Sequence, residues 1–272
     1  MNAPERMVLP DIQAGLDTRD IEIDAVGIKN VRYPVTIQSS RGAAPTVARF
    51  SMTVTLPATA KGTHMSRFIE MLETLPEPLS QGAFRAMAVR MVERLGARIG
   101  TIEMQFPYFV SKSAPVSGVR SRVDYNVRWR ASVTDTGPCS FGLRVVVPVT
   151  SLCPCSKEIS EYGAHNQRSH IAIEAETAGE MAIEELIDVA EHSASCEVYG
   201  LLKRVDEKYV TEKAYDNPKF VEDLVRDVAV ALERDPRVRT FTVEAENFES
   251  IHNHSAYARI APRPRESPEA GS

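Results

Sequence analysis

The sequence predicts an α+β fold in which antiparallel sheets carry helices, built as two successive units of similar element order. Three observations predict it. Several stretches alternate apolar and polar residues with a period of two, which is typical of strands with one wet side. Other stretches repeat apolar residues with helical spacing. The order strand–strand–helix–helix–strand–strand occurs once before and once after Gly137-Pro138. No sequence self-similarity supports a repeat, so the two-unit interpretation rests on element order.

The first half is expected to contain two strands, two helices and two more strands. We place them at residues 21–37, 47–56, 67–73, 84–95, 101–110 and 123–130. The helix at 84–95 has the clearest pattern, because its apolar residues recur at i, i+3, i+4, i+7 and i+11, and Ser80 upstream is a possible start signal. In the strand at 123–130, Val123, Tyr125, Val127 and Trp129 share one face, as an antiparallel strand requires.

The second half repeats the order less regularly. A strand at 141–149 leads into a turn-rich loop, and a strand at 169–176 is followed by a helix whose apolar face begins at Ile183. Asn217-Pro218 is a typical helix start, so a second helix is expected to run from there to about Leu232. Strands at 241–247 and 256–260 complete the unit. We therefore expect units at 19–137 and 138–261, with mobile tails at 1–18 and 262–272, which are rich in proline, charge and small residues.

Composition limits the class of protein. The chain has 272 residues, 43% of them hydrophobic and 25% charged, which is ordinary for a globular protein. The apolar runs are too short to span a bilayer, and the first residues lack the pattern of a secretory signal. A cytoplasmic location is expected, where reduced cysteines favour metal binding or catalysis over disulfides. The net charge of −5 argues against a general nucleic-acid binder but allows a few local cations to hold an anionic small molecule.

The segment from Pro148 to His170 carries the most chemical information. Half of the four cysteines lie in three residues, as Cys153-Pro-Cys155, and His165 follows ten residues later in the same segment. Two small buried thiols are one interpretation, since cysteine is often buried. Divalent-metal binding is the stronger one, because thiolate and imidazole are good ligands. A closed structural zinc site usually has four protein ligands, whereas a single thiol pair suits an open, catalytic site.

Two histidines and two carboxylates are further candidates. His252 and His254 alternate, so in an extended segment both imidazoles face one side, which suits proton chemistry or ligation. Two surface histidines would give the same pattern. Glu207 lies in a polar stretch between helices that also fits a solvated loop. Glu222 lies off the apolar stripe of its helix, and the pattern alone makes it a solvent-facing charge.

Taken together, the string SLCPCSKEIS-x-YGAHNQRSH, the later Glu207 and Glu222, and His252-x-His254 resemble the type IB GTP cyclohydrolases. The resemblance covers residues 18 to 261. It implies a tunnelling fold (T-fold) with two tandem ββααββ units, helices on one face, and a homotetramer whose active sites lie at subunit interfaces. The implied enzyme, a hydrolase acting on cyclic amidines, converts GTP and water to formate and 7,8-dihydroneopterin triphosphate. This is the first step of pterin and folate biosynthesis.

The resemblance also implies roles for individual residues. Cys153, His165 and Glu207 would bind a divalent metal, for which zinc, manganese and iron all fit the mixed ligand set. Cys153, His252 and His254 would be catalytic, and Glu222 would bind the guanine edge. Cys155 belongs to the motif without an assigned role.

The triphosphate requires cations. Lys157 and Arg168, which flank the thiol loop within the segment from Pro148 to His170, are the expected phosphate-binding residues.

Two other functions remain open on the residues alone. A T-fold enzyme without a metal would use Cys153 as a nucleophile on a purine-like substrate, and chelators would not inhibit it. A purine- or pterin-binding protein would use the thiols for a structural metal, and metal removal would unfold it.

Overall fold

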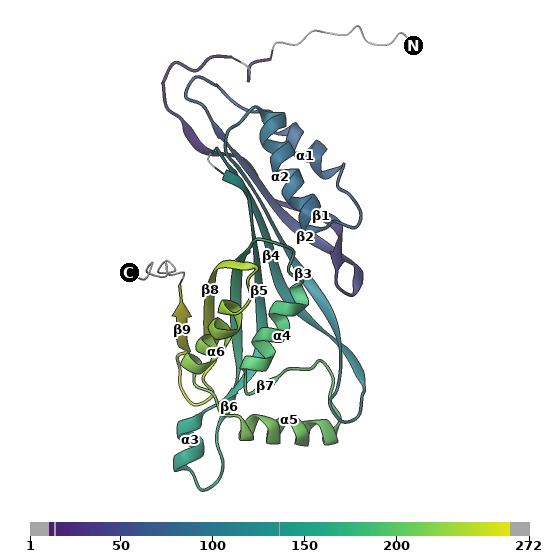
Figure 1. The fold of residues 1–272 in the computed structure, drawn as a ribbon, viewed down its shortest axis with the longest axis vertical. Coiled ribbons are helices and arrows are strands. Elements are labelled where there is room, and N and C mark those ends of the chain that lie inside the picture. The colour runs from purple at the N-terminus through teal and green to yellow at the C-terminus, as the bar shows by residue number, and fades with distance from the viewer. Residues whose placement is uncertain (1–10, 14, 136, 262–272) are drawn as a thin grey trace, which may run out of the picture.

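The computed structural model describes residues 11–13, 15–135 and 137–261. One nine-stranded antiparallel sheet runs through both halves of this part in the order β1-β2-β3-β4-β5-β6-β8-β9, and β7 pairs with β5 beside β4 (Figure 1). The strands are β1 (Ile23–Ser39), β2 (Gly42–Leu56), β3 (Gly100–Ser113), β4 (Arg120–Thr134), β5 (Gly137–Leu152), β6 (Asn166–Thr177), β7 (Cys196–Glu197), β8 (Val238–Asn247) and β9 (Ala256–Ile260). The predicted α+β class with antiparallel strands is confirmed.

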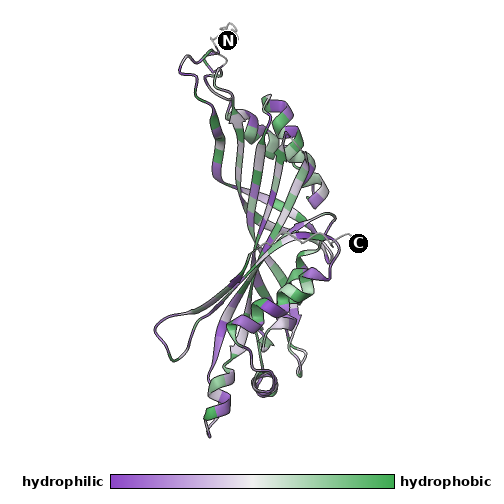
Figure 2. Ribbon diagram, turned by 60° about the vertical axis from the view of Figure 1, so that its left-hand side comes forward, coloured by the Kyte–Doolittle hydropathy of each residue, from purple (hydrophilic) through white to green (hydrophobic). Residues whose placement is uncertain are grey.

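Helices cover one side of the curved sheet (Figure 2). α1 (Ser66–Leu72) and α2 (Gln81–Leu95) lie over the first half, and α4 (Ile183–Ser193) and α6 (Val221–Glu233) lie over the second. α3 (Pro154–Ile159) and α5 (Arg204–Asp216) lie at the far end of the second half (Figure 1). Ser80 starts α2 as expected, since its hydroxyl accepts a hydrogen bond from the Ala83 amide at 3.1 Å. None of the helices in the described residues has the length and apolar character needed to cross a membrane.

The hydrophobic core is continuous across the two halves. Phe84 of α2 packs edge-on against Trp129 of β4 at 5.7 Å and against Phe141 of β5 at 6.3 Å between ring centroids. All three side chains are buried. Such edge-to-face contacts between aromatic rings stabilise a core beyond the area they bury. The helix of the first half therefore rests on the boundary between the halves.

The side of the sheet without helices carries alternating charges, called the ion-pair ladder below. Its nitrogen–oxygen distances range from 2.7 to 3.9 Å. Its members, from β3 to β9, are Glu103, Arg128, Glu174, Arg144, Glu244 and Arg259. These side chains point away from the core because neighbouring strand residues alternate between the two faces.

The sequence expectations differ from the structure in several places. Gly137-Pro138, where a break between two units was expected, is the start of β5, and the sheet is continuous there, with Thr134 of β4 opposite Gly137 and Ser132 opposite Ser140. The helix expected from Pro218 begins at Val221, with Phe220 as its N-cap residue, and Asp223 in the first turn accepts a hydrogen bond from the Phe220 amide. Asn217 instead ends the preceding helix.

The expected tails are described only in part. Residues 1–10 and 262–272 lie outside the described residues. Within 11–18, Leu16 forms a bridge with Ala60, and the Asp17 amide donates to the Thr59 carbonyl at 2.9 Å.

Candidate functional site

The thiol segment begins where β5 ends. Cys153 is the N-cap of α3, and its Sγ accepts a hydrogen bond from the Ser156 amide at 3.4 Å. Pro154 occupies the first helical turn, where its fixed φ fits and its missing N–H is not needed. The expected loop therefore contains a short helix. Cys153 is half-buried and Cys155 is exposed, so both thiols remain accessible beside this turn.

His165 returns to the first turn of α3. We call Cys153, this first turn of α3 and His165 the thiol turn. The Cys153 amide donates to the His165 carbonyl at 3.1 Å. The His165 amide donates to the Ser156 hydroxyl at 3.2 Å. Gly163, with φ of +111°, reverses the chain just before this point, in a region that favours glycine. The structure thus brings Cys153 and His165 together at the level of the backbone, as a shared ligand pair requires.

A row of polar side chains leads from His165 into the core. His165 Nδ1 lies 2.8 Å from Gln167 Oε1, and Gln167 Nε2 donates to Ser151 Oγ at 3.1 Å. Ser151 Oγ lies 2.7 Å from Ser169 Oγ, which donates to Asn247 Oδ1 at 2.8 Å. We call Gln167, Ser151, Ser169 and Asn247 the polar row. All four are buried.

Sequence reasoning missed the polar row, although a signal for it was present. Ser151 continues the core-facing positions of β5 after Val147 and Val149, and Gln167 and Ser169 precede Ile171 on β6 in the same way. Polar residues at core-facing positions of a strand need hydrogen-bond partners, since burying an unpaired polar group is unfavourable. A search for such positions finds the row.

His252 and His254 lie in the loop between β8 and β9, and both are exposed. Their rings stack with centroids 5.1 Å apart and an interplanar angle of 21°. The expectation that both imidazoles face one side is confirmed, although the segment is a loop and not a strand. Ser250 of the same loop lies with its hydroxyl 3.3 Å from His165 Nδ1. This contact connects the histidine loop to the thiol turn.

Glu207 lies on α5 and is exposed, so the solvated loop considered from the sequence is a helix. The neighbouring Asp206 anchors this helix. Its Oδ1 accepts from the amides of Val116 and Ser117 at 2.9 and 2.8 Å. Its Oδ2 accepts from the Ser117 hydroxyl at 2.6 Å and from the Lys203 amide at 2.8 Å.

The third expected metal ligand is not gathered with the other two. Within residues 11–13, 15–135 and 137–261, no three His, Cys, Asp or Glu side chains lie close enough to hold a metal ion. Cys153 and His165 share the thiol turn, whereas Glu207 lies on the separate helix α5.

The two expected phosphate-binding cations both lie next to α5. The Lys157 ammonium donates to the Tyr215 carbonyl at 2.5 Å and lies 4.3 Å from the centre of the Tyr215 ring. Arg168 is exposed on β6 and lines a groove of about 210 Å³ together with Thr150 and with Val210 of α5.

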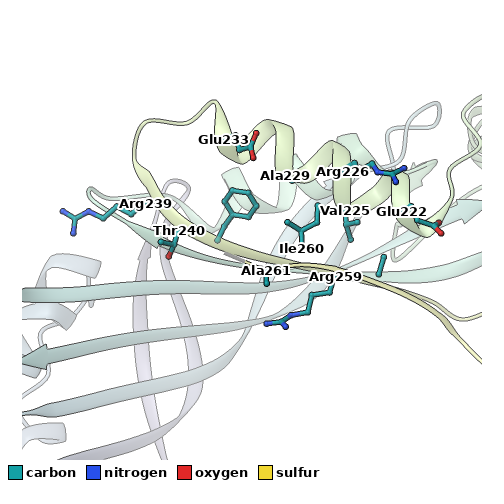
Figure 3. Close-up of a pocket in the computed structure, with 12 residues that line it drawn as sticks. Glu222, Val225, Arg226, Ala229, Glu233, Arg239, Thr240, Arg259, Ile260 and Ala261 are labelled. Atoms are coloured by element: carbon teal, nitrogen blue, oxygen red, sulfur yellow. The ribbon is translucent and has the colours of Figure 1, made fainter. Parts of the chain in front are cut away.

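Glu222 lies in the first turn of α6, at the end of a groove of about 500 Å³ between α6, β8 and β9 (Figure 3). Arg226 and Arg259 line the same groove. The chain just before α6 contacts the thiol turn, because the Lys219 amide donates to the carbonyl of Leu152 at 3.0 Å. Glu222 is therefore three residues after Lys219, whose amide is bonded to the residue before Cys153.

Charged groups also shape the groove beside Arg168. Burial alone would raise the pKa of Glu197, but hydrogen bonds from Lys213 and Tyr199 outweigh it and lower the pKa to about 2. Burial, with the nearby Glu197 charge, raises the pKa of the Cys196 thiol to about 12. Cys196 is therefore an unreactive thiol. On β6, which also carries Arg168, burial and, as a second cause, the Arg168 charge lower the pKa of His170.

Comparison with known proteins gives a consistent result. The sequence model of the family "Type I GTP cyclohydrolase folE2" matches residues 9–258. The chain is 58% identical over 253 residues to the GTP cyclohydrolase FolE2 of Cupriavidus necator, covering 93% of this chain and 94% of that protein. It is 59% identical over 254 residues to the FolE2 protein of Paraburkholderia xenovorans, with the same coverage. To a FolE2 protein of Dechloromonas aromatica it is 56% identical over 261 residues, covering 96% of this chain and 98% of that one.

Among solved structures the chain is similar in fold to uricase from Arthrobacter globiformis. The TM-score is 0.52 with 8% sequence identity, over 90% of this chain and 94% of that one. At this identity the similarity shows the fold alone, and it supports the expected T-fold.

Proposed function

The chain belongs to the type I GTP cyclohydrolase FolE2 family, and from this membership we propose that it hydrolyses GTP to 7,8-dihydroneopterin triphosphate and formate. The reaction consumes one water and opens the folate pathway. The observation that carries the proposal within the structure is the thiol turn, where Cys153 and His165 are held together by the 3.1 Å backbone hydrogen bond between them.

The ligand chemistry of this turn fits a divalent metal ion. Cys153 offers a half-exposed thiol, and the contact of His165 Nδ1 with Gln167 leaves its Nε2 available. We propose these two side chains as ligands, together with Glu207 of α5 as a third. When bound, such an ion lowers the pKa of water from 15.7 to about 7 and so supplies a nucleophile for C8 of the purine. Zinc, manganese and iron remain the proposed ions.

The chain's own residues account for the proton transfers. Ring opening at C8 and rearrangement of the ribose both need protons moved to and from nitrogen and oxygen. His252 and His254, exposed and stacked in the loop that Ser250 ties to His165, are the proposed general acid–base groups. Such groups typically contribute about 10²–10⁴-fold to a rate. Their exposure lets them exchange protons with solvent between turnovers.

Glu222 is the proposed guanine-binding residue. A carboxylate accepts two N–H groups from the guanine edge, and an adenine analogue lacks that donor pair. Lys157 and Arg168 are the proposed triphosphate-binding residues. Lys157 already contacts a carbonyl at the end of α5, so its ammonium must exchange this neutral partner for a phosphate, which attracts it more strongly.

A subunit interface at this end of the molecule is part of the proposal. Ile159 at the end of α3 is 83% exposed, Tyr162 just after it is 99% exposed, and Ile251 in the loop between β8 and β9 is 65% exposed. Exposed large apolar side chains near a polar site are candidates for a contact surface. We propose the homotetramer of the sequence analysis as its form, with each site completed by a neighbouring subunit. The four cysteines, all within the described part, are free, which agrees with the proposed cytoplasmic location.

The test is to strip metal from the purified protein and incubate it with GTP, alone and with added Mn²⁺, Zn²⁺ or Fe²⁺. Formate release and the fluorescence of oxidised neopterin are followed together. Restoration of both signals by a metal supports the proposal and identifies the usable ions. Formate without neopterin would mean that the reaction stops after ring opening.

Two outcomes of the same experiment would refute the proposal. Full activity after metal removal would favour a metal-independent enzyme with Cys153 as nucleophile. Unfolding on metal removal, without activity in the reloaded protein, would favour a binding protein with a structural metal. A thermal melt with and without chelator separates the second outcome from simple loss of activity.

A further inference from the structure

The amide orientations of Asn247 and Gln167 set one hydrogen-bond direction along the polar row. Ser169 has one hydroxyl hydrogen and donates it to Asn247 Oδ1 at 2.8 Å. In its 2.7 Å contact with Ser151, Ser169 must then accept, so Ser151 donates. Ser151 in turn accepts from Gln167 Nε2 at 3.1 Å. Gln167 thus turns its amide nitrogen toward the core and its oxygen toward His165.

This direction determines the tautomer of His165. An amide oxygen only accepts, so the 2.8 Å contact between Gln167 Oε1 and His165 Nδ1 requires a hydrogen on Nδ1. In the neutral ring Nε2 then carries the lone pair. A hydroxyl both donates and accepts, so the 3.3 Å contact of Ser250 with Nδ1 is compatible with this state.

We propose that Gln167 is a positioning residue that, through the polar row, fixes His165 as the Nδ1–H tautomer and so prepares Nε2 to bind a metal ion. The proposal rests on the proposed function, because it assigns His165 the role of ligand. Gln167 acts through His165 and contacts no reacting atom. The other members of the row, Ser151, Ser169 and Asn247, are nine-tenths or more buried, so water does not compete for the hydrogen bonds among them and the direction of the row is maintained.

The row could also run in the opposite direction. If the amides of Asn247 and Gln167 were both rotated by 180°, every hydrogen bond would reverse, and Gln167 would donate to His165 Nδ1. The hydrogen of the neutral ring would then lie on Nε2, which would exclude a metal from that atom. Asn247→Asp distinguishes the two directions, because a carboxylate accepts from Ser169 and cannot donate to it.

The row also reaches the histidine loop. Asn247 is the last residue of β8, and the amide of the next residue, Phe248, donates to the Arg168 carbonyl at 3.0 Å. The loop with His252 and His254 begins there. The strand that contributes Asn247 to the polar row therefore also leads into the loop of the proposed acid–base pair.

The first measurement needs neither metal nor GTP. In metal-free protein labelled with ¹⁵N-histidine at pH 8, the ring nitrogen shifts report the tautomer, and the His165 signals are assigned by their loss in His165→Asn. We expect the Nδ1–H form in the wild type and in Asn247→Asp, and a mixture in Gln167→Leu. An Nε2–H ring in the wild type would overturn the proposal, whatever the enzyme's activity.

The second measurement is Zn²⁺ affinity, from competition with a chromophoric chelator. Gln167→Leu should weaken binding by about 10- to 100-fold, the usual effect of losing a partner that orients a metal-binding histidine. Gln167→Glu, which keeps an obligatory acceptor for Nδ1–H, should restore most of the affinity. A merely structural role of Gln167 does not predict this rescue.

Gln81→Leu is the matched control. Gln81 is as buried as Gln167, each being 7% exposed, and it also bonds to a neighbouring segment through both amide atoms. It should lose stability in the same way but keep wild-type Zn²⁺ affinity. Equal Zn²⁺ affinity in Gln167→Leu and Gln81→Leu would refute the proposal. If Gln167→Leu does not fold, Ser151→Ala replaces it, because the variant removes the acceptor that fixes the amide of Gln167.

Discussion

Replacing Asp206 with alanine should lower the melting temperature by on the order of 10 °C, because its carboxylate joins α5 to the turn between β3 and β4. The side chain has no exposed surface. It accepts four hydrogen bonds, from the amides of Val116, Ser117 and Lys203 and from the Ser117 hydroxyl, at 2.6 to 2.9 Å. The net contribution of one hydrogen bond to stability, about 1 kcal/mol, corresponds to about 2–4 °C in the melting temperature of a chain of this size. In the variant, water replaces part of each hydrogen bond.

The decrease in melting temperature caused by Asp206→Ala should depend on pH in one direction. Burial alone would raise the pKa of Asp206, but the hydrogen bonds from Ser117, Lys203 and Val116 outweigh it and hold the pKa below the ordinary value of 3.8. A lowered folded-state pKa contributes stability that is fully present above the unfolded-state pKa and is lost as pH falls through the folded-state one. The difference in melting temperature between wild type and Asp206→Ala should therefore be constant near neutral pH and narrow below about pH 4.

The assay is a thermal melt followed by circular dichroism from pH 3 to 8. Asp216→Ala is the control, since it makes the same substitution at an exposed position of the same helix. It should stay close to the wild type. If Asp206→Ala melts with Asp216→Ala at neutral pH, or if the difference between wild type and Asp206→Ala widens in acid, the reasoning is wrong.

Three further predictions concern the site. Cys153→Ala should abolish GTP turnover with an unchanged melting temperature, because the half-exposed thiol makes a single 3.4 Å hydrogen bond; full activity would contradict this. Glu222→Gln should raise KM for GTP by about 10- to 100-fold, since the amide leaves one guanine N–H unpaired, and an unchanged KM would exclude the role. Burial alone would raise the pKa of Glu197, but hydrogen bonds from Lys213 and Tyr199 lower it to about 2. The stability that Glu197 supplies should therefore be present above about pH 4.5 and fall toward pH 2. Glu197→Gln should flatten that acid limb of the stability profile, and an unchanged limb would contradict the assignment.

Much of the fold was predictable because hydrophobic alternation decides which face of a strand is buried. Val123, Tyr125, Val127 and Trp129 were expected on one face, and all four are buried. The helix at 84–95 was expected from its apolar spacing, and α2 spans 81–95. Strands β2 to β6 and β8 are longer than predicted, because ladder hydrogen bonds continue through polar residues that the alternation leaves out, whereas β9 has the predicted bounds.

Helix α5 was not predictable by the same means. Asp206 and Ala214 are its only residues described as buried, so it has no apolar stripe. Its position depends on polar contacts with Val116 and Ser117, about 90 residues earlier in the chain. Periodicity does not record such partners. Glu207 therefore lies on a helix because its neighbour Asp206 binds that helix to Val116 and Ser117.

The site also has a part that the sequence predicted and a part that it did not. The thiol turn was evident from the spacing of Cys153, Cys155 and His165, because chemistry-bearing residues stand out in sequence. The polar row was overlooked because serine, glutamine and asparagine are common, and only their position on the buried face of β5 and β6 distinguishes them. Their partners come from three strands, which sequence spacing alone does not connect.

The ion-pair ladder has a consequence for how an anionic nucleotide reaches the protein. Each of its three arginines lies within 4 Å of a neighbouring glutamate along the ladder. The opposite charges therefore cancel at distances beyond about one Debye length, roughly 8 Å at physiological salt. At longer range an approaching triphosphate meets the net charge of the chain, −5, which repels it. Diffusional capture of GTP should consequently quicken as salt is added, the reverse of the behaviour of proteins that attract their substrates through a positive surface.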